Sequence, residues 1–317
     1  MRVPRDEYAL ELGLPDGRSS WVVCEECGLV YQSPRPNSAV VADLYEGGEY
    51  HETRGGVPEH YVRYSLRRSQ RALDWVFAHP ALVGRTGRAL DIGCGIGGAV
   101  TNLRSRGWEA SGVEPDPNLA TIGRSRFGLD IVDGFFSASS FAKGTTFDLA
   151  YSCHVWEHLA DPMATTRAVH ELLAPSAGIL VIVVPTFRRA RTLAWTCFAA
   201  PHTYMFTDVS LGNVLRATGF EPLAHRFAAG GDSELWMMAR AVPEANATPQ
   251  EERLSDIQRE LSLVPLKFPL GLPGRVLTHA RTLAADPKEF GRRVGRWTRY
   301  QAGRVGRAVK PRARDER

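Results

Sequence analysis

Two acidic residues and a run of glycines form a pattern typical of a ligand-binding turn. Asp91 stands near the end of an apolar run, and Gly93 and Gly95 follow it in the spacing D-x-G-x-G-x-G. Glycine permits a tight turn and lets a ligand approach bare backbone. Glu114 ends the next apolar run about 20 residues later, where a carboxylate binds the hydroxyl pair of a ribose. The pattern predicts a site for a nucleoside-containing cofactor, with a nicotinamide dinucleotide as the less favoured candidate.

Three histidines and a glutamate form a second group of reactive side chains. His154, Glu157 and His158 read H-x-x-E-H, and His202 follows further along the chain. Certain zinc peptidases use this spelling within a helix, but here the segment follows a predicted strand. An imidazole that titrates near neutral pH removes a proton from a hydroxyl. Three hypotheses stay open: one of the histidines is a general base, the four residues bind a metal, or they only fix the turn.

Strands and helices alternate regularly through the middle of the chain. Apolar runs bounded by turn residues predict strands at 88–93, 109–113, 129–132, 147–152, 179–184, 221–228 and 234–241. Helical spacing and capping residues predict helices at 61–76, 98–106, 117–127, 162–173 and 208–218. This alternation predicts an α/β fold with a doubly wound, mostly parallel seven-stranded sheet covered on both faces.

Three segments resemble the class I S-adenosylmethionine-dependent methyltransferases, over about residues 50–241. They are the glycine turn at 89–98, the block 147–162, and the block 202–211 followed by Gly219-Phe220. The resemblance implies a Rossmann-like methyltransferase fold, S-adenosyl-L-methionine as cofactor and methyl transfer as the reaction. Aligning a hydroxyl with the methyl group is then the main task of the protein.

The resemblance also implies which residues contact the cofactor and the acceptor. In the family, the glycine loop lies under the methionine part of the cofactor and the acid ending the second strand binds the ribose. These roles fall to Asp91, Gly93, Gly95 and Glu114, and the adenine side to Gly134 and Phe135. The candidate catalytic residues are His154, His158 and His202, and His202 is the favoured base.

A related resemblance concerns metals. Some methyltransferases of RNA 3′ ends or of ubiquinone precursors carry acid-x-x-Glu-His at this point and bind a divalent cation. Here His154 stands where those proteins have the acid. Three imidazoles and a carboxylate suit a transition metal better than Mg²⁺, and a divalent metal is possible here but not favoured. Two rival functions stay open, a metal-assisted RNA-terminus methyltransferase and a module that binds S-adenosylmethionine without catalysis.

The N-terminal segment carries a close cysteine pair in a predicted hairpin at 20–31. Cys24 and Cys27 resemble one half of a zinc ribbon, and similar knuckles precede several methyltransferases, including ones that act on sugars. A structural zinc needs four ligands, and His51 and His60 are the nearby candidates, so zinc is not favoured here. The knuckle resemblance implies O-methylation of a small-molecule or glycan acceptor, namely a sugar, glycan or secondary-metabolite hydroxyl.

Charge is distributed unevenly along the chain. Residues 291–317 hold ten basic and two acidic side chains, a net charge of +8 against +4 for the whole chain, so the remainder sums to −4. An acidic body makes nucleic acid an unexpected partner. The basic tail is expected to pack on the domain as a helix, and peripheral contact with an anionic membrane is the less favoured expectation.

Length and composition set the remaining expectations. With 317 residues, 44% hydrophobic and 23% charged, the chain has the make-up of an ordinary globular protein. We expect a knuckle module at 1–49, a methyltransferase domain at 50–243 and a helical basic extension at 244–317. The apolar run 179–184 is far shorter than the roughly 18 residues of a membrane span. Five cysteines and no signal-peptide pattern predict a cytoplasmic protein, whose oligomeric state stays open.

Overall fold

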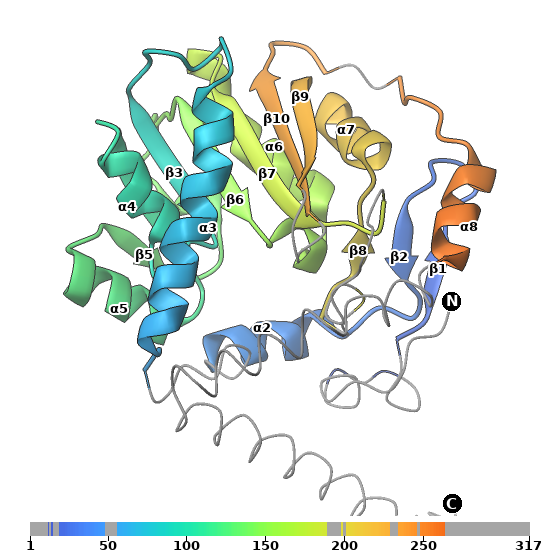
Figure 1. Ribbon diagram of the computed structural model, residues 1–317, viewed down its shortest axis with the longest axis horizontal. Helices are drawn as coiled ribbons and strands as arrows, with labels where there is room; N and C mark the ends of the chain where they lie inside the picture. The colour runs from blue at the N-terminus through green and yellow to red at the C-terminus, as the bar shows by residue number, and fades with distance from the viewer. Residues whose placement is uncertain are drawn as a thin grey trace, which may run out of the picture.

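A seven-stranded sheet forms the centre of the molecule (Figure 1). The computed structural model describes residues 12, 14, 19–47, 56–188, 198, 201–228, 234–245 and 248–263. The strands are β3 (Arg88–Ile92), β4 (Glu109–Glu114), β5 (Ile131–Asp133), β6 (Leu149–Cys153), β7 (Ile179–Pro185), β9 (Phe220–Ala228) and β10 (Glu234–Ala241). Their order is β5-β4-β3-β6-β7-β10-β9. Neighbours from β5 to β7 pair in parallel, and only β10 runs antiparallel to both of its neighbours, which confirms the predicted fold class.

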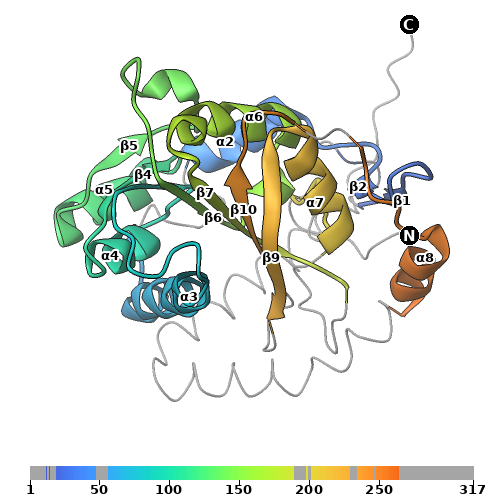
Figure 2. The same ribbon diagram turned by 90° about the horizontal axis from the view of Figure 1, so that it is seen from above.

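Helices cover both faces of this sheet (Figure 2). One face carries α3 (Glu59–Phe77), α4 (Gly98–Arg104) and α5 (Pro117–Phe127), and the other carries α6 (Pro162–Leu173) and α7 (Asp208–Ala217). The inner strand β7 is buried at every position, because helices cover both faces of the sheet at this point. Because the chain order reverses between β3 and β6, the carboxyl ends of these strands flank a natural ligand crevice.

Helix starts follow the capping residues of the sequence. The Asp116 side chain accepts from the backbone N–H groups of Asn118 and Leu119 at the start of α5, with Pro117 in the first helical position. Asp161 accepts from Ala164 N at the start of α6 in the same way. Three short 3₁₀ turns complete the described domain: η3 (Ala138–Ser140), η4 (Trp156–His158) and η5 (Ala174–Ser176).

A small second sheet joins the N-terminal hairpin to the rest of the chain. The predicted hairpin is present as β1 (Trp21–Val23) and β2 (Val30–Gln32), and β2 pairs with β8 (Tyr204–Met205). A short helix, α2 (Ser38–Glu46), follows and crosses below the carboxyl ends of the parallel strands (Figure 1). Neither α2 nor β8 was expected from the sequence. The division at residue 49 stays a prediction, but one sheet takes strands from both sides of it.

The described part of the C-terminal extension is one helix, α8 (Leu254–Ser262), which packs against the hairpin through the buried Ile257. The basic tail at 291–317 lies outside the described residues. No helix among the described residues combines the length and apolar character that a membrane crossing needs.

Candidate active site

The glycine turn after β3 leaves one side of its backbone open. Gly93 and Gly95 have φ angles of 71° and 56°, which other residues rarely adopt. A Cβ atom on Gly93 would lie 2.4 Å from Cγ2 of Val155, so this position is filled by the protein itself. At Gly95 the nearest atom to such a Cβ is Oη of Tyr61, 3.8 Å away. The turn therefore offers a ligand free space beside Gly95.

Glu114, at the end of β4, faces this turn. Its two carboxylate oxygens accept hydrogen bonds from Gly95 N (2.7 Å) and Asp116 N (2.9 Å). Burial raises the pKa of Glu114 to about 7 even though both hydrogen bonds lower it. Burial, with the nearby Glu114, also raises the pKa of Asp91 well above its usual range. Two acidic groups thus lie behind the open side of the turn.

A cavity of about 590 Å³ extends from this turn across the carboxyl ends of the strands. Of the residues predicted to contact the cofactor, Gly93, Glu114 and Phe135 line it. Gly95 and Gly134 lie next to the lining, since their N–H groups donate to the Glu114 side chain and to the Glu114 carbonyl oxygen (2.9 Å). Asp91 lies deeper and is buried. The segment from the end of β2 through α2 also lines the cavity, through Arg35, Pro36, Ser38, Val41, Ala42 and Tyr45.

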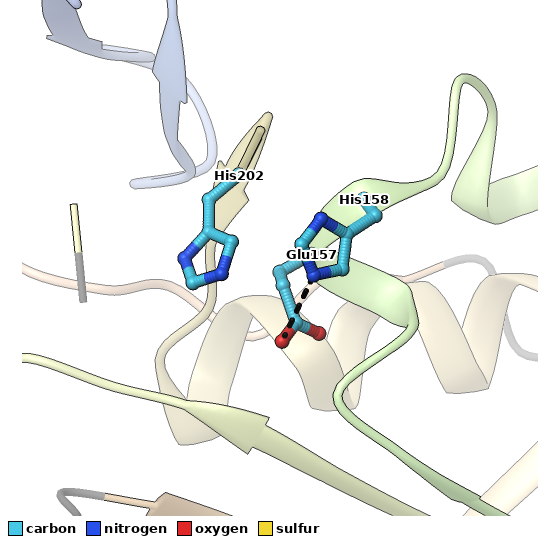
Figure 3. A group of neighbouring side chains, drawn as sticks. All are labelled: Glu157, His158 and His202. Atoms are coloured by element: carbon cyan, nitrogen blue, oxygen red, sulfur yellow. Dashed lines mark ion pairs between the residues drawn. The ribbon is translucent and has the colours of Figure 1, made fainter. Parts of the chain in front are cut away.

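The predicted histidines gather beside this cavity. After β6, His154 adopts a φ of 60°, and the chain then forms the 3₁₀ turn η4 rather than the helix that the peptidase hypothesis requires. Figure 3 shows Glu157, His158 and His202 facing one another from η4 and the segment before β8. One ligand atom from each of the three lies within 4.8 Å of the others. The backbone holds the two segments together, because Thr203 N donates to the Glu157 carbonyl oxygen at 2.6 Å.

The hydrogen bonding of His158 fixes the role of each ring nitrogen. Nδ1 donates to the carbonyl oxygen of Pro201 at 3.1 Å, so in the neutral ring Nε2 carries the lone pair. That Nε2 lies 3.7 Å from Oε1 of Glu157 (Figure 3, dashed line). Glu157 is fully buried, neither carboxylate oxygen has a hydrogen bond among the described residues, and burial raises its pKa to about 8. The buried Glu157 carboxyl therefore lies close to the His158 nitrogen that carries the lone pair in the neutral ring.

His154 lies on the other side of Glu157. Its Nε2 is 3.1 Å from Oε1 of Glu234, and its Nδ1 is 3.5 Å from Oε1 of Glu157. Glu234 also forms an ion pair with Arg68 and accepts from Nε1 of Trp236. These partners lower the pKa of Glu234 to about 2 against the effect of burial. His154 and His158 both line the cavity, whereas His202 is not among its lining residues and packs edge-on against His158, with the ring centroids 4.6 Å apart.

Comparisons with known proteins identify the family. Residues 59–225, more than half of the chain, match the family described as a methyltransferase domain. The chain belongs to the S-adenosylmethionine-dependent methyltransferases.

Two curated relatives are similar to this methyltransferase over part of its sequence. It is 27% identical over 150 residues to the sterol 4-C-methyltransferase strm-1 of Caenorhabditis elegans, covering 45% of this chain and 43% of the relative. It is 33% identical over 153 residues to the ubiquinone biosynthesis O-methyltransferase of Ruegeria pomeroyi, covering 43% of this chain and 60% of the relative. The chain thus spans about half the length of these relatives.

A solved structure shares the fold of this methyltransferase. It is the 1,6-didemethyltoxoflavin-N1-methyltransferase of Burkholderia thailandensis, bound to 1,6-didemethyltoxoflavin and S-adenosylhomocysteine. The TM-score is 0.50 at 19% identity, and the match covers 71% of this chain and 99% of that one.

The ionisation of Glu114 predicts how cofactor affinity of the methyltransferase depends on pH. If Glu114 accepts hydrogen bonds from the ribose hydroxyls, as the sequence predicts, cofactor binding favours the ionised form of a group whose pKa is raised to about 7. Affinity should rise with pH through this value, and the Kd for S-adenosylhomocysteine should fall about tenfold from pH 6 to pH 8. Isothermal titration calorimetry measures this change. Glu114→Gln, which cannot ionise, should flatten the profile, and a flat profile in the unaltered chain would contradict the prediction.

Several residues of the methyltransferase site were not found from sequence. Tyr45 of α2 packs edge-on against Phe135 and His158, at centroid distances of 6.4 and 5.9 Å. Tyr61 of α3 lies beside the open side of Gly95. The signal for α2 was present, since Asn37 is a good N-cap and apolar residues recur at 40, 41, 44 and 45.

The cysteine pair of the methyltransferase has free thiols. Backbone hydrogen bonds, chiefly that involving Cys27, lower the pKa of Cys24, whereas burial raises that of Cys27. Among the described residues, no group of three metal-ligating side chains includes either cysteine. His51 lies outside the described residues, so zinc at the knuckle stays untested.

Proposed function

We propose that this methyltransferase transfers the methyl group of S-adenosylmethionine to a hydroxyl of a small-molecule acceptor. The supporting observation is one cavity of about 590 Å³ that is lined by the predicted cofactor residues Gly93, Glu114 and Phe135 and also by Tyr45 and Thr203. This volume lies in the range of small-molecule sites. His154 and His158 line the same cavity, and we place the methyl donor and the acceptor next to them.

The residues around the glycine turn offer S-adenosylmethionine a hydrogen-bond acceptor, room beside the backbone and an aromatic ring. The open side of Gly95 admits the methionine part, and Glu114 is oriented by two backbone N–H groups to accept from the ribose hydroxyls. Phe135, 45% exposed, offers a ring face to the adenine. When bound, the cofactor supplies an electrophilic methyl group, and the protein has to align the acceptor and exclude water.

His158 is the candidate base for an acceptor hydroxyl. It lines the cavity, and its Nδ1–H donates to the Pro201 carbonyl oxygen, so the basic lone pair of the neutral ring is on Nε2. His202 packs behind His158 and is 6% exposed, so we assign it the positioning of the His158 ring. Base catalysis of this kind contributes about 10² to 10⁴ in rate.

The acceptor end has mostly apolar walls. Val41, Ala42, Tyr45 and Leu159 line it, with hydroxyls from Ser38, Thr165 and Thr203 between them. Such walls favour a secondary metabolite with an apolar body over a sugar or glycan, whose many hydroxyls would lose water without compensation. An O-methyltransferase of ubiquinone biosynthesis among the relatives is consistent with a hydroxyl acceptor.

Two measurements test the proposed function. The chain is titrated with S-adenosylhomocysteine, and it is then incubated with S-adenosylmethionine and a panel of hydroxylated compounds while the formation of S-adenosylhomocysteine is followed. Binding together with an acceptor-dependent product that is about 14 Da heavier, the mass of one CH₂ group, supports the proposal. Binding without transfer to any acceptor would favour a module that binds the cofactor without catalysis.

The cluster in Figure 3 supports a second candidate, metal-assisted methyl transfer. Glu157, His158 and His202 offer two nitrogens and one oxygen within 4.8 Å of one another, and the Glu157 carboxylate has no hydrogen bond among the described residues. This donor set fits a transition metal better than Mg²⁺. When bound there, such an ion would supply Lewis acidity toward the acceptor hydroxyl.

Metal analysis separates this candidate from base catalysis. If the cluster binds an ion, purified protein should carry metal that is lost in the Glu157→Gln/His202→Ala variant, because two of the three ligands are changed. A Cys24→Ser/Cys27→Ser variant is the control, since metal lost there belongs to the knuckle. Metal-free protein with full turnover in a chelator would remove the metal-assisted candidate.

A further inference from the structure

Arg35 stands on the wall of the acceptor end of the cavity. It lies between β2 and α2, is exposed, and lines the cavity together with Pro36 and Ser38. Its guanidinium group is held in position by two tyrosines. Nη1 donates to Oη of Tyr204 at 2.9 Å, and the guanidinium carbon lies 5.3 Å from the ring centroid of Tyr204 and 5.9 Å from that of Tyr31.

The aromatic support for Arg35 is itself held in place. Tyr31 and Tyr204 are paired residues of β2 and β8, so both rings extend from one small sheet. Oη of Tyr204 in turn donates to the carbonyl oxygen of Ala160 at 3.2 Å, and Ala160 also lines the cavity. A cation stacked on two rings keeps a defined orientation, so a ligand that binds it loses little additional freedom.

The positive charge of Arg35 has no acidic partner within the described part of the chain. Salt bridges within 4.0 Å involve eight other arginines, for example Arg124 with Asp133 and Arg126 with Glu59, but not Arg35. The carboxylate of Asp161 is engaged at the start of α6. Glu114, the acidic residue of the cavity lining, is one of the predicted cofactor residues. The acceptor end therefore carries a fixed positive charge that its own lining does not balance.

We propose that Arg35 is an anion subsite of the acceptor pocket and that the acceptor is a hydroxylated aromatic carboxylic acid. This inference rests on the proposed function, because it names the acceptor class for the same cavity. A planar guanidinium binds a carboxylate through paired hydrogen bonds. Tyr45, Val41 and Leu159 supply the apolar surfaces that a flat ring needs next to it.

Matched acids and esters test the subsite. Full-length protein saturated with S-adenosylhomocysteine is titrated at pH 7.5 with 3,4-dihydroxybenzoate and with its methyl ester, and with further pairs of hydroxylated aromatic acids and esters. The acids should bind about tenfold or more tightly than their esters, the range for a hydrogen bond to a charged group. Arg35→Gln should abolish the preference, and Arg35→Lys should retain part of it.

Arg71→Gln is the matched control, because Arg71 is an exposed arginine of α3 that does not line the cavity. This variant should keep the preference for acids. Cofactor affinity, measured in the same samples, shows that each variant is folded. Equal binding of acids and esters, or binding of no acid in the set, overturns the inference, as does a preference that survives Arg35→Gln.

Measurements on the same variants distinguish failure of the anion subsite from failure of the proposed function. Transfer to the hydroxylated aromatic acids at an unchanged rate and KM in Arg35→Gln leaves the proposed function standing and overturns the subsite. Charge-selective binding without transfer to any acceptor supports the subsite and contradicts the proposed function. Inorganic phosphate and glucose 6-phosphate are titrated last, and tighter binding of these than of the aromatic acids overturns the assignment of a carboxylate.

Discussion

Replacing His158 with alanine should lower the turnover number by about 10² to 10⁴ while the Kd of the cofactor stays unchanged. The side chain lines the cavity, and its Nδ1–H is engaged by the Pro201 carbonyl oxygen. A base acts in the transition state, so its loss should appear in kcat. Steady-state kinetics with an identified acceptor measures the effect.

His225→Ala is the control for this variant. His225 lies in β9 with its side chain 45% exposed, and it does not line the cavity. Turnover there should stay near that of the unaltered chain. His202→Ala should cost less than His158→Ala if His202 only positions the neighbouring ring. The reverse order would return the role of base to His202.

Replacing Glu114 with alanine should weaken cofactor binding by about 1.5 to 3 kcal/mol, the range for hydrogen bonds to a charged group. This corresponds to roughly 10- to 150-fold in Kd. The physical reason is the loss of a buried carboxylate that two backbone N–H groups hold in the cavity wall. Titration with S-adenosylhomocysteine measures the change.

Glu109→Ala provides the control on the same strand. Glu109 begins β4, its side chain is 80% exposed, and it lies at the opposite end of the strand from the cavity. Its replacement should leave the Kd unchanged. Thermal unfolding of both variants distinguishes loss of affinity from loss of fold, because Glu114→Ala also leaves the N–H groups of Gly95 and Asp116 without their acceptor. Unchanged affinity in folded Glu114→Ala would sink the assignment.

The glycine turn and its neighbouring elements could be predicted because their signals are local. A glycine turn between a buried strand and a helix specifies its own geometry, and Glu114 reaches Gly95 because β3 and β4 are adjacent parallel strands. The α5 helix was predicted with its observed bounds because Asp116, Pro117 and Gly128 mark both of its ends. The third strand begins at Ile131 rather than 129, since the residues after Gly128 first complete the turn.

The acceptor end could not be predicted in the same way because it depends on pairings between distant segments. Arg35 contacts Tyr204 because the two-residue strand β8 pairs with β2. Two residues are too few to show the alternation of apolar and polar side chains by which a strand is predicted. Arg68 meets Glu234 across more than half the length of the chain. The sequence indicated His154, His158 and His202 as candidates. Only the structure shows that His154 and His158 line the cavity and that His202 packs against His158.

The pairing of β2 with β8 attaches a short N-terminal segment to a domain that carries the predicted cofactor residues, so the two parts can change independently in evolution. Residues 19–47 supply Arg35 and Tyr45 to the acceptor wall, whereas the cofactor turn and Glu114 belong to β3, β4 and the turn after β3. If the proposed function holds, substitutions at Arg35 should change which acceptor binds while Glu114 and the glycine turn stay intact. A transplanted segment needs a strand that matches Tyr204 and Met205, because that contact sets its register. On the proposed function, exchange of residues 19–47, roughly a tenth of the chain, is then expected to change acceptor specificity.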